Sequence, residues 1–170
     1  MRSREVSSRH RFTWCLPTLA VLVLVTACTS PVTERSALSL KGNMGLVAFD
    51  FNTAVEGDYQ VRLSGAFGKV LKMDNVPAGE SIYLYKFSPG KYCISALYLT
   101  GSDKLLEFAG KSPCFMVSAG KLTYAGTLSN STYRFYVIDY DGFINSLKSA
   151  YPQVYNRYVL GAGSVNQPST

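Results

Sequence analysis

The spacing of apolar residues has the period of β-strands over most of the chain. Between residues 46 and 140, short runs alternate apolar with polar positions, and Gly, Pro, Asn and Ser interrupt them at intervals typical of turns. The pattern predicts strands over residues 46–51, 59–63, 69–73, 81–87, 91–99, 114–117, 121–128 and 133–140, with residues 105–108 either a short strand or part of a loop. About eight strands at this spacing predict an all-β fold, an antiparallel β-sandwich.

Individual strands carry further signals about their surroundings. One face of the first strand is apolar and consists of Val47, Phe49 and Phe51. The strand at 91–99 is apolar on both faces, which predicts a buried, central position. Turn residues at 88–90 predict that it forms a hairpin with the strand at 81–87. Gly126, inside the strand at 121–128, predicts a bulge or a close approach of another part of the chain. The face expected for that strand holds Leu122, Tyr124, Gly126 and Leu128.

After residue 140 the period becomes that of an α-helix. One apolar stripe is formed by Phe143, Ile144, Leu147, Ala150 and Tyr151. Asp141 is the expected N-cap, and Pro152 marks the end of the helix or a restart. The predicted organisation is therefore a β-sandwich over 43–140, one C-terminal helix over 141–158 that packs on it, and a disordered tail over 159–170.

The first 27 residues have the organisation of a signal peptide. Four arginines form the positive part, namely Arg2, Arg4, Arg9 and Arg11. The apolar run at 16–25 has the length of a signal sequence and is shorter than a comfortable membrane span of about 20 residues. The stretch at 28–42 is rich in Ser, Thr and Pro and predicts a flexible tether between the processed N-terminus and the sandwich.

The end of this segment carries a more specific pattern. Val25-Thr26-Ala27-Cys28 resembles the lipobox of bacterial lipoproteins, which implies cleavage before Cys28 and a diacylglyceryl thioether on its sulfur, with a further acyl chain such as palmitate on the new N-terminus. Two or more acyl chains anchor a protein stably in a membrane. Residue 29 is Thr, whereas an Asp at this position would signal retention in the inner membrane. Thr29 therefore resembles the default sorting to the outer membrane, and the sequence leaves open whether the protein faces the periplasm or the cell surface. The alternatives are an ordinary secretory peptide and an uncleaved anchor.

Processing at this point changes the composition. The chain has 17 basic and 11 acidic residues, and removing the signal peptide leaves 13 and 10. The basic residues form no cluster, which argues against nucleic-acid binding. The only His and the only Trp, His10 and Trp14, lie in the signal peptide. The processed protein therefore has no His-based catalysis and no imidazole metal site.

Cysteine usage follows from the same reading. Cys15 is removed with the signal peptide and Cys28 is lipidated, so Cys93 and Cys114 remain as a pair in an oxidising compartment. We predict a disulfide between them. The alternative is a redox-active pair, which lacks the support of a Cys-x-x-Cys motif.

Two stretches resemble known families. Phe87-Ser88-Pro89-Gly90-Lys91-Tyr92 resembles the Pro-Gly-x-Tyr turn of transthyretin-like and carboxypeptidase-regulatory-like β-sandwiches, which are Ig-like in architecture. Residues 115–126 resemble a strand–turn–strand of an uncharacterised bacterial lipoprotein family with that predicted fold, in which a Tyr-Pro pair follows in the C-terminal helix, as Tyr151-Pro152 does here. The resemblance covers about residues 46–152 and implies the fold, but no functional residue.

Candidate chemistry in the sequence is sparse. Asp139-Tyr140-Asp141-Gly142, with Asn145 beyond, has a partial Ca²⁺-loop pattern but lacks a third ligand position, so a strand-to-helix turn explains it better. One candidate binding face is predicted where aromatic residues occupy both odd and even positions of a strand, namely Tyr133, Phe135 and Tyr136. Carboxylates are dispersed and show no catalytic pair. We predict no catalytic residue, no metal and no cofactor.

These observations favour a non-enzymatic binding or structural module, anchored in the bacterial outer membrane by acyl chains on Cys28 and acting with an envelope protein partner. One alternative is a carboxylate-dependent enzyme of the cell wall or of surface polysaccharide. Another is a chaperone or inhibitor module that pairs the edge strand at 133–140 with a partner.

Overall fold

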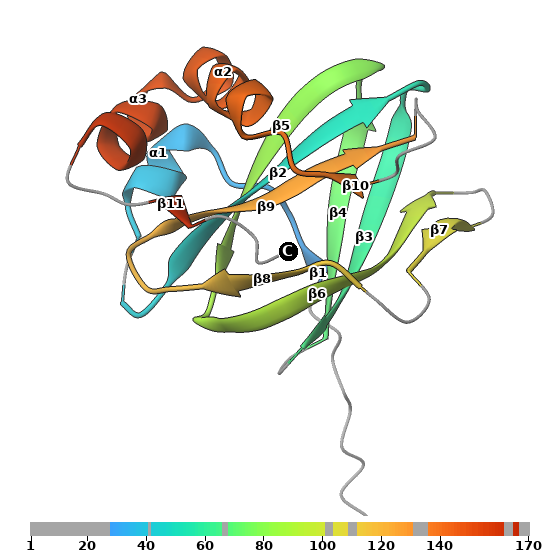
Figure 1. Cartoon of the computed structure of the whole chain (residues 1–170), viewed down its shortest axis with the longest axis horizontal. Helices are drawn as coiled ribbons and strands as arrows, with labels where there is room; N and C mark the ends of the chain where they lie inside the picture. The colour runs from blue at the N-terminus through green and yellow to red at the C-terminus, as the bar shows by residue number, and fades with distance from the viewer. Residues whose placement is uncertain are drawn as a thin grey trace, which may run out of the picture.

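Two β-sheets pack face to face, and helices cover the outer face of one of them (Figure 1). The computed structural model describes residues 28–40, 42–65, 68–100, 104–108, 112–130, 136–161 and 165–166. The predicted signal peptide lies outside these residues. The all-β sandwich with a helix packed on it is confirmed. No helix in the described ranges is long and apolar enough to span a membrane.

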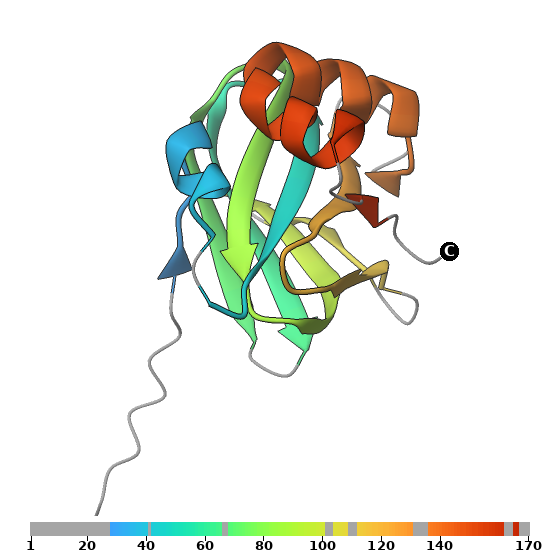
Figure 2. The same cartoon turned by 90° about the vertical axis from the view of Figure 1, so that its left-hand side faces the viewer.

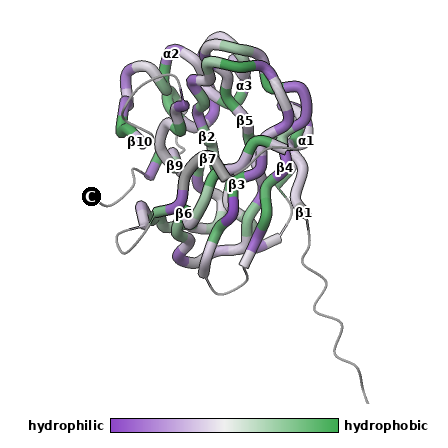
Figure 3. Tube along the Cα trace, turned by 90° about the vertical axis from the view of Figure 1, so that its right-hand side faces the viewer, coloured by the Kyte–Doolittle hydropathy of each residue, from purple (hydrophilic) through white to green (hydrophobic). Residues whose placement is uncertain are grey.

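The first sheet, sheet A, contains six strands. They are β1 (Cys28–Thr29), β3 (Gly57–Gly65), β4 (Lys69–Val76), β6 (Gly90–Leu99), β7 (Lys104–Glu107) and β8 (Cys114–Val117). Their order is β1-β4-β3-β6-β7, and β8 also pairs with β6. Hydrophobic and hydrophilic residues alternate along its strands (Figure 3), because one face meets the other sheet and one meets solvent.

The second sheet, sheet B, is the middle layer of the molecule. Its strands are β2 (Gly45–Thr53), β5 (Gly79–Phe87), β9 (Leu122–Ser129), β10 (Tyr136–Val137) and β11 (Val165–Asn166). The order is β10-β9-β2-β5, with β11 also pairing with β9. Most strand pairs of the sandwich are antiparallel, as predicted, but β2 and β9 pair in parallel. Parallel neighbours need a long crossover, and the strands of sheet A between them supply it.

The helices are α1 (Glu34–Leu38), α2 (Tyr140–Ala150), α3 (Pro152–Tyr155) and a π-helical turn, η1 (Asn156–Leu160). They lie together over sheet B (Figure 2). The predicted C-terminal helix is therefore broken at Pro152. Its N-cap is Asp139 and not Asp141, because the helix begins at Tyr140. The Asp139 carboxylate accepts a 2.9 Å hydrogen bond from the backbone N–H of Gly142.

Two segments predicted to be flexible contain ordered structure. In the expected tether, the backbone N–H of Val32 donates to the Leu84 carbonyl at 2.8 Å, and Ala37 of α1 is fully buried. The tether prediction is wrong because apolar side chains of this segment fill the edge of the helical layer. In the expected tail, β11 pairs in parallel with β9 and covers an edge of that strand.

The middle position of sheet B creates two apolar cores. The core between the sheets contains Val47, Phe49 and Phe51, as predicted. The core between sheet B and the helices contains Leu46, Ala48, Tyr124, Phe143 and Leu147. The strands buried on both faces are thus β2 and β9. The strand at 91–99, β6, is central in sheet A as predicted, but the prediction that both of its faces are buried is wrong. Its outer face is partly exposed because none of the described helices covers sheet A.

The turn at residues 88–90 carries the chain from one sheet to the other. It does not form the predicted hairpin, since β5 pairs with β2 in sheet B and β6 pairs with β3 in sheet A. The Tyr92 hydroxyl donates to the Ser88 carbonyl at 3.0 Å, and the Tyr92 ring meets the Phe87 ring edge-on. An arch is favoured because both strands then turn their aromatic faces into the same core.

The predicted disulfide is confirmed. Cys93 on β6 and Cys114 on β8 are directly opposite each other, with an S–S distance of 2.01 Å. In the chain-entropy model, a loop of this length stabilises the fold by about 3 kcal/mol.

The predicted irregularity at Gly126 is confirmed as a bulge. Against β2, Ala48 pairs with Tyr124 but Asp50 pairs with Thr127, so β9 contains one extra residue. Gly126 has φ +106°, a conformation that L-residues rarely adopt. The Tyr136 ring lies where a Cβ of residue 126 would be.

We predict that Gly126→Ala destabilises the protein by at least about 2 kcal/mol, through backbone strain and overpacking. Gly79→Ala is the matched control, because Gly79 also has positive φ (+96°) but no atom lies within 4 Å of its would-be Cβ. Urea unfolding followed by far-UV circular dichroism measures both. Equal losses in the two variants would show that the contact with Tyr136 contributes nothing.

Candidate functional site

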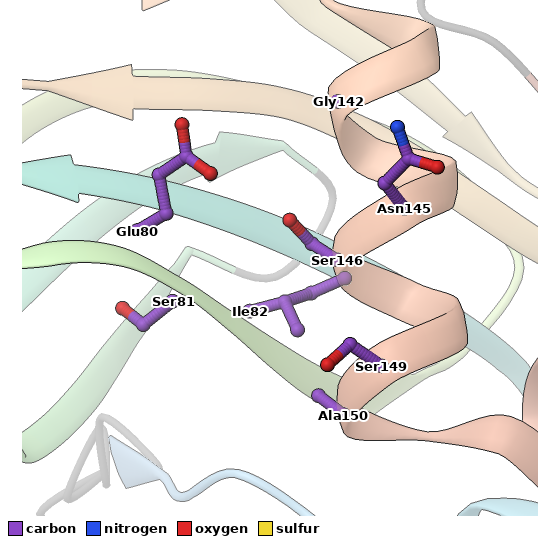
Figure 4. Close-up of a pocket in the computed structure, with 8 residues that line it drawn as sticks. All are labelled: Glu80, Ser81, Ile82, Gly142, Asn145, Ser146, Ser149 and Ala150. Atoms are coloured by element: carbon purple, nitrogen blue, oxygen red, sulfur yellow. The ribbon is translucent and has the colours of Figure 1, made fainter.

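Two adjoining cavities lie where α2 meets sheet B. The first, the acidic cavity, has a volume of about 190 Å³ and is lined mainly by polar residues, including Asp50, Asn52, Glu80, Thr127, Ser129 and Asp139. The second, the serine groove, has a volume of about 420 Å³ and runs between β5 and α2 past Ser81, Ile82, Asn145, Ser146 and Ser149 (Figure 4). Glu80 and Gly142 line both, so the two cavities adjoin at these residues.

Strand alternation places Asp50 in the acidic cavity. On β2, Leu46 and Ala48 face the helices, while Phe49 and Phe51 face sheet A. Asp50 is the next residue on the helix-facing side, beyond the apolar contacts of that layer. Only 5% of its surface is exposed.

The bulge at Gly126 brings Thr127 to the same side. Without the extra residue, Leu128 would share a face with Leu122 and Tyr124, as the sequence pattern predicts. In the structure Leu128 belongs to the core between the sheets, and Thr127 lies with Tyr124 on the helix side. That face prediction is therefore wrong beyond Gly126. The bulge places a hydroxyl, and not a leucine, beside Asp50.

A chain of hydrogen bonds ends on the Asp50 carboxylate. Thr127 Oγ1 donates to Asp50 Oδ2 at 3.0 Å, and Thr127 Oγ1 lies 2.7 Å from the Tyr124 hydroxyl. Since the proton of Thr127 is directed to Asp50, Tyr124 is the donor in the second bond. The Tyr124 hydroxyl in turn accepts from the backbone N–H of Asp139 at 3.2 Å. One carboxylate oxygen is thus held in a fixed orientation.

The other oxygen of Asp50 is not satisfied. Oδ1 is buried and accepts no hydrogen bond of acceptable geometry. Burial raises the pKa of Asp50 to about 6, and the negative charges of Glu80 and Asp139 add to the rise, against the opposing effects of Thr127 and the Phe51 backbone N–H. A buried carboxylate oxygen without a hydrogen-bond partner is costly to the fold, so Oδ1 indicates a site for a positive group or a proton.

The residues singled out by sequence do not assemble into this site. Tyr136 has a packing role, because its ring covers Gly126 and its hydroxyl donates to the Ala125 carbonyl at 2.9 Å. Tyr133 and Phe135 lie outside the described residues. Cys28 is described by its backbone, which pairs with Val70 at the edge of sheet A. Cys93 and Cys114 form the disulfide away from the cavities.

The partial Ca²⁺-loop pattern is a helix start. The Asp139 carboxylate caps α2, and Gly142 leaves room for it, because a Cβ at position 142 would lie 2.5 Å from Asp139 Oδ2. Among the described residues, no group of three or more His, Cys, Asp or Glu side chains could hold a metal ion.

Sequence reasoning missed Asp50 and Glu80. The available signal was that Asp50 is the only charged residue in the apolar strand Gly45–Thr53. A charge in a strand that is otherwise buried is unusual and points to a specific role.

Comparisons with protein-family models, with curated proteins and with solved structures found no match for this chain. The functional argument therefore depends on the geometry of the cavities.

We predict that Asp50→Asn stabilises the protein relative to wild type, by about 2 kcal/mol more at pH 7.5 than at pH 4. The folded pKa of about 6 exceeds the unfolded value of about 3.9, so the folded state binds the proton more tightly and wild type loses stability as the pH rises from 4 to 6. The Asn variant lacks this loss and can still accept from Thr127.

Urea unfolding of both proteins at the two pH values measures the difference. Asp74→Asn is the control, because Asp74 is exposed on β4 of sheet A. A stability difference between Asp50→Asn and wild type that does not change with pH would contradict the prediction.

Proposed function

We propose that this protein is a lipid-anchored binding module of the bacterial outer membrane, held by acyl chains on Cys28, that recognises an envelope partner through the acidic cavity and the serine groove. The lipobox resemblance of residues 25–28 supports the anchor. The resemblance of residues 87–92 and 115–126 to transthyretin-like lipoproteins is part of the same proposal.

One observation carries the recognition half of this proposal. Asp50 is nearly fully buried, lines a cavity and has an oxygen without a hydrogen-bond partner. A protein selected for stability alone would gain by replacing such a group with an apolar or neutral residue. Its presence is explained if a partner group completes the hydrogen bonding of Oδ1.

The position of β1 bears on how an anchor on Cys28 would hold the domain at the membrane. Cys28 pairs with Val70 at the edge of sheet A. In Figure 2, β1 lies below α1 and apart from α2 and α3, which lie over sheet B. The groove is on the helix side of sheet B. An anchor on Cys28, which itself belongs to β1, would hold the domain close to the bilayer.

A carboxylate-dependent enzyme is the second candidate function. It is favoured by the three carboxylates of the acidic cavity, of which Asp50 has a pKa of about 6, a value suited to a general acid. Against it, the Asp139 carboxylate is engaged as a helix cap. The edge-strand alternative gains no support from the described residues, because β10 has two residues, Tyr136–Val137.

We predict that cells fed a clickable palmitate analogue label the wild-type protein, and that Cys28→Ala abolishes the labelling. The thioether requires the Cys28 sulfur, so no other residue can replace it. The Ala variant should also be released from the membrane fraction. Equal labelling of both proteins would refute the anchor.

We predict that a photo-crosslinking amino acid at Asn145 captures a specific envelope partner in intact cells. Asn145 is exposed and lines the serine groove. The same amino acid at Lys72, exposed on β4 of sheet A, is the matched control. Adding Asp50→Asn and Glu80→Gln to the protein that carries the photo-crosslinking amino acid at position 145 should remove the adduct. Equal adducts at both positions, or an adduct unaffected by the two substitutions, would exclude the groove as the recognition site.

A further inference from the structure

We infer that the acidic cavity binds the primary ammonium group of an unbranched alkylamine, and that the polar remainder of the ligand lies along the serine groove. The inference rests on the proposed function in one respect, which is that it takes the groove as the recognition site.

The charge of the cavity selects a cation. Its lining contains the carboxylates of Asp50, Glu80 and Asp139, and no basic side chain lines either cavity among the residues that the structure describes. Removing a cation from water is compensated only where several acceptors surround it. Asp50 Oδ1 is the acceptor that most requires a donor, because it is buried and has no partner.

The geometry favours an ammonium over a guanidinium. A guanidinium binds a carboxylate best through two parallel hydrogen bonds, one to each oxygen. Here Oδ2 of Asp50 already accepts from Thr127, which the bulge at Gly126 holds in place. An ammonium is a compact group with three donors that can be shared between Asp50 Oδ1 and the Glu80 carboxylate.

The volumes favour a narrow head and a longer polar body. The acidic cavity, at about 190 Å³, holds the equivalent of about six water molecules, enough for an ammonium on a short chain. The larger serine groove adjoins it at Glu80 and Gly142. Figure 4 shows the Ser146 and Ser149 hydroxyls on the side of α2 that faces β5, where they can hydrogen-bond a polar ligand. Free polyamines and lysine side chains of a polypeptide share this chemistry.

Binding is coupled to the protonation of Asp50. The groups that face Asp50 are Glu80 from β5, Asp139 from the start of α2, and Tyr124 and Thr127 from β9. Burial and the two negative charges disfavour its ionised form, whereas a bound ammonium stabilises that form. Binding near pH 6 therefore releases a proton, and affinity rises with pH until Asp50 is ionised in the free protein.

The test is a calorimetric titration of the full chain, purified in an uncharged detergent, with pentylamine. We expect binding of pentylamine and none of 1-pentanol, which has a similar size and no charge, with pentylguanidine weaker than pentylamine. Asp50→Asn should weaken the affinity for pentylamine at least tenfold and Glu80→Gln several-fold, while the exposed Asp74→Asn leaves it unchanged. Between pH 5 and pH 7 the affinity of the wild type should increase about tenfold, and that of Asp50→Asn should stay constant.

Further titrations separate the two sources of the ammonium. Tighter binding of 1,5-diaminopentane than of Nα-acetyl-lysine amide supports the inference and assigns a free polyamine. The reverse order supports it and assigns a lysine side chain. Binding of neither, or equal binding of pentylamine and 1-pentanol, overturns it. If Asp50→Asn does not fold, Glu80→Gln decides, because Glu80 is exposed and belongs to neither core.

The two proposals fail in different ways. A crosslinked partner at Asn145 without any amine binding would overturn the ammonium inference and leave the binding module standing. Amine binding without a crosslinked partner would support the inference and count against an envelope partner.

Discussion

The close contact between Gly126 and the Tyr136 ring is the constraint on which the organisation of sheet B depends. The positive φ of Gly126 allows one extra residue in β9, and Tyr136 occupies the space that a side chain would take. The bulge reverses the alternation of β9 halfway along the strand. Tyr124 then faces the helices while Leu128 faces sheet A, so one strand supplies both cores.

The same reversal creates the polar site. Thr127 comes to lie beside Asp50 on a face that would otherwise have continued as an apolar surface. The helices cover Leu46 and Ala48 of that face, and the chain of hydrogen bonds from the start of α2 through Tyr124 reaches only one oxygen of Asp50. The fold therefore keeps an unsatisfied charge at the boundary between a packed core and a cavity, where a ligand can stabilise it.

Local patterns in the chain predicted much of the architecture. The alternation in residues 46–51 correctly placed Val47, Phe49 and Phe51 on the inner face, because strand periodicity is a property of the backbone. The glycine at 126 was enough to predict a bulge, and compartment reasoning led to the disulfide between Cys93 and Cys114. The helical stripe after residue 142 correctly predicted a helix docked on the sandwich, since Phe143 and Leu147 are fully buried.

What the sequence by itself determined was the identity of the elements and the faces of most strands, because these follow from the spacing of apolar residues and from turn chemistry. Only the tertiary structure decided which strands share a sheet, since the turn at 88–90 is compatible with a hairpin or an arch until β5 and β6 find their partners. It also decided the site: Asp50 and Glu80 lie on different strands, and Thr127 joins them only through the reversal at Gly126. Such a juxtaposition arises from pairing between segments distant in sequence, and no local pattern contains it.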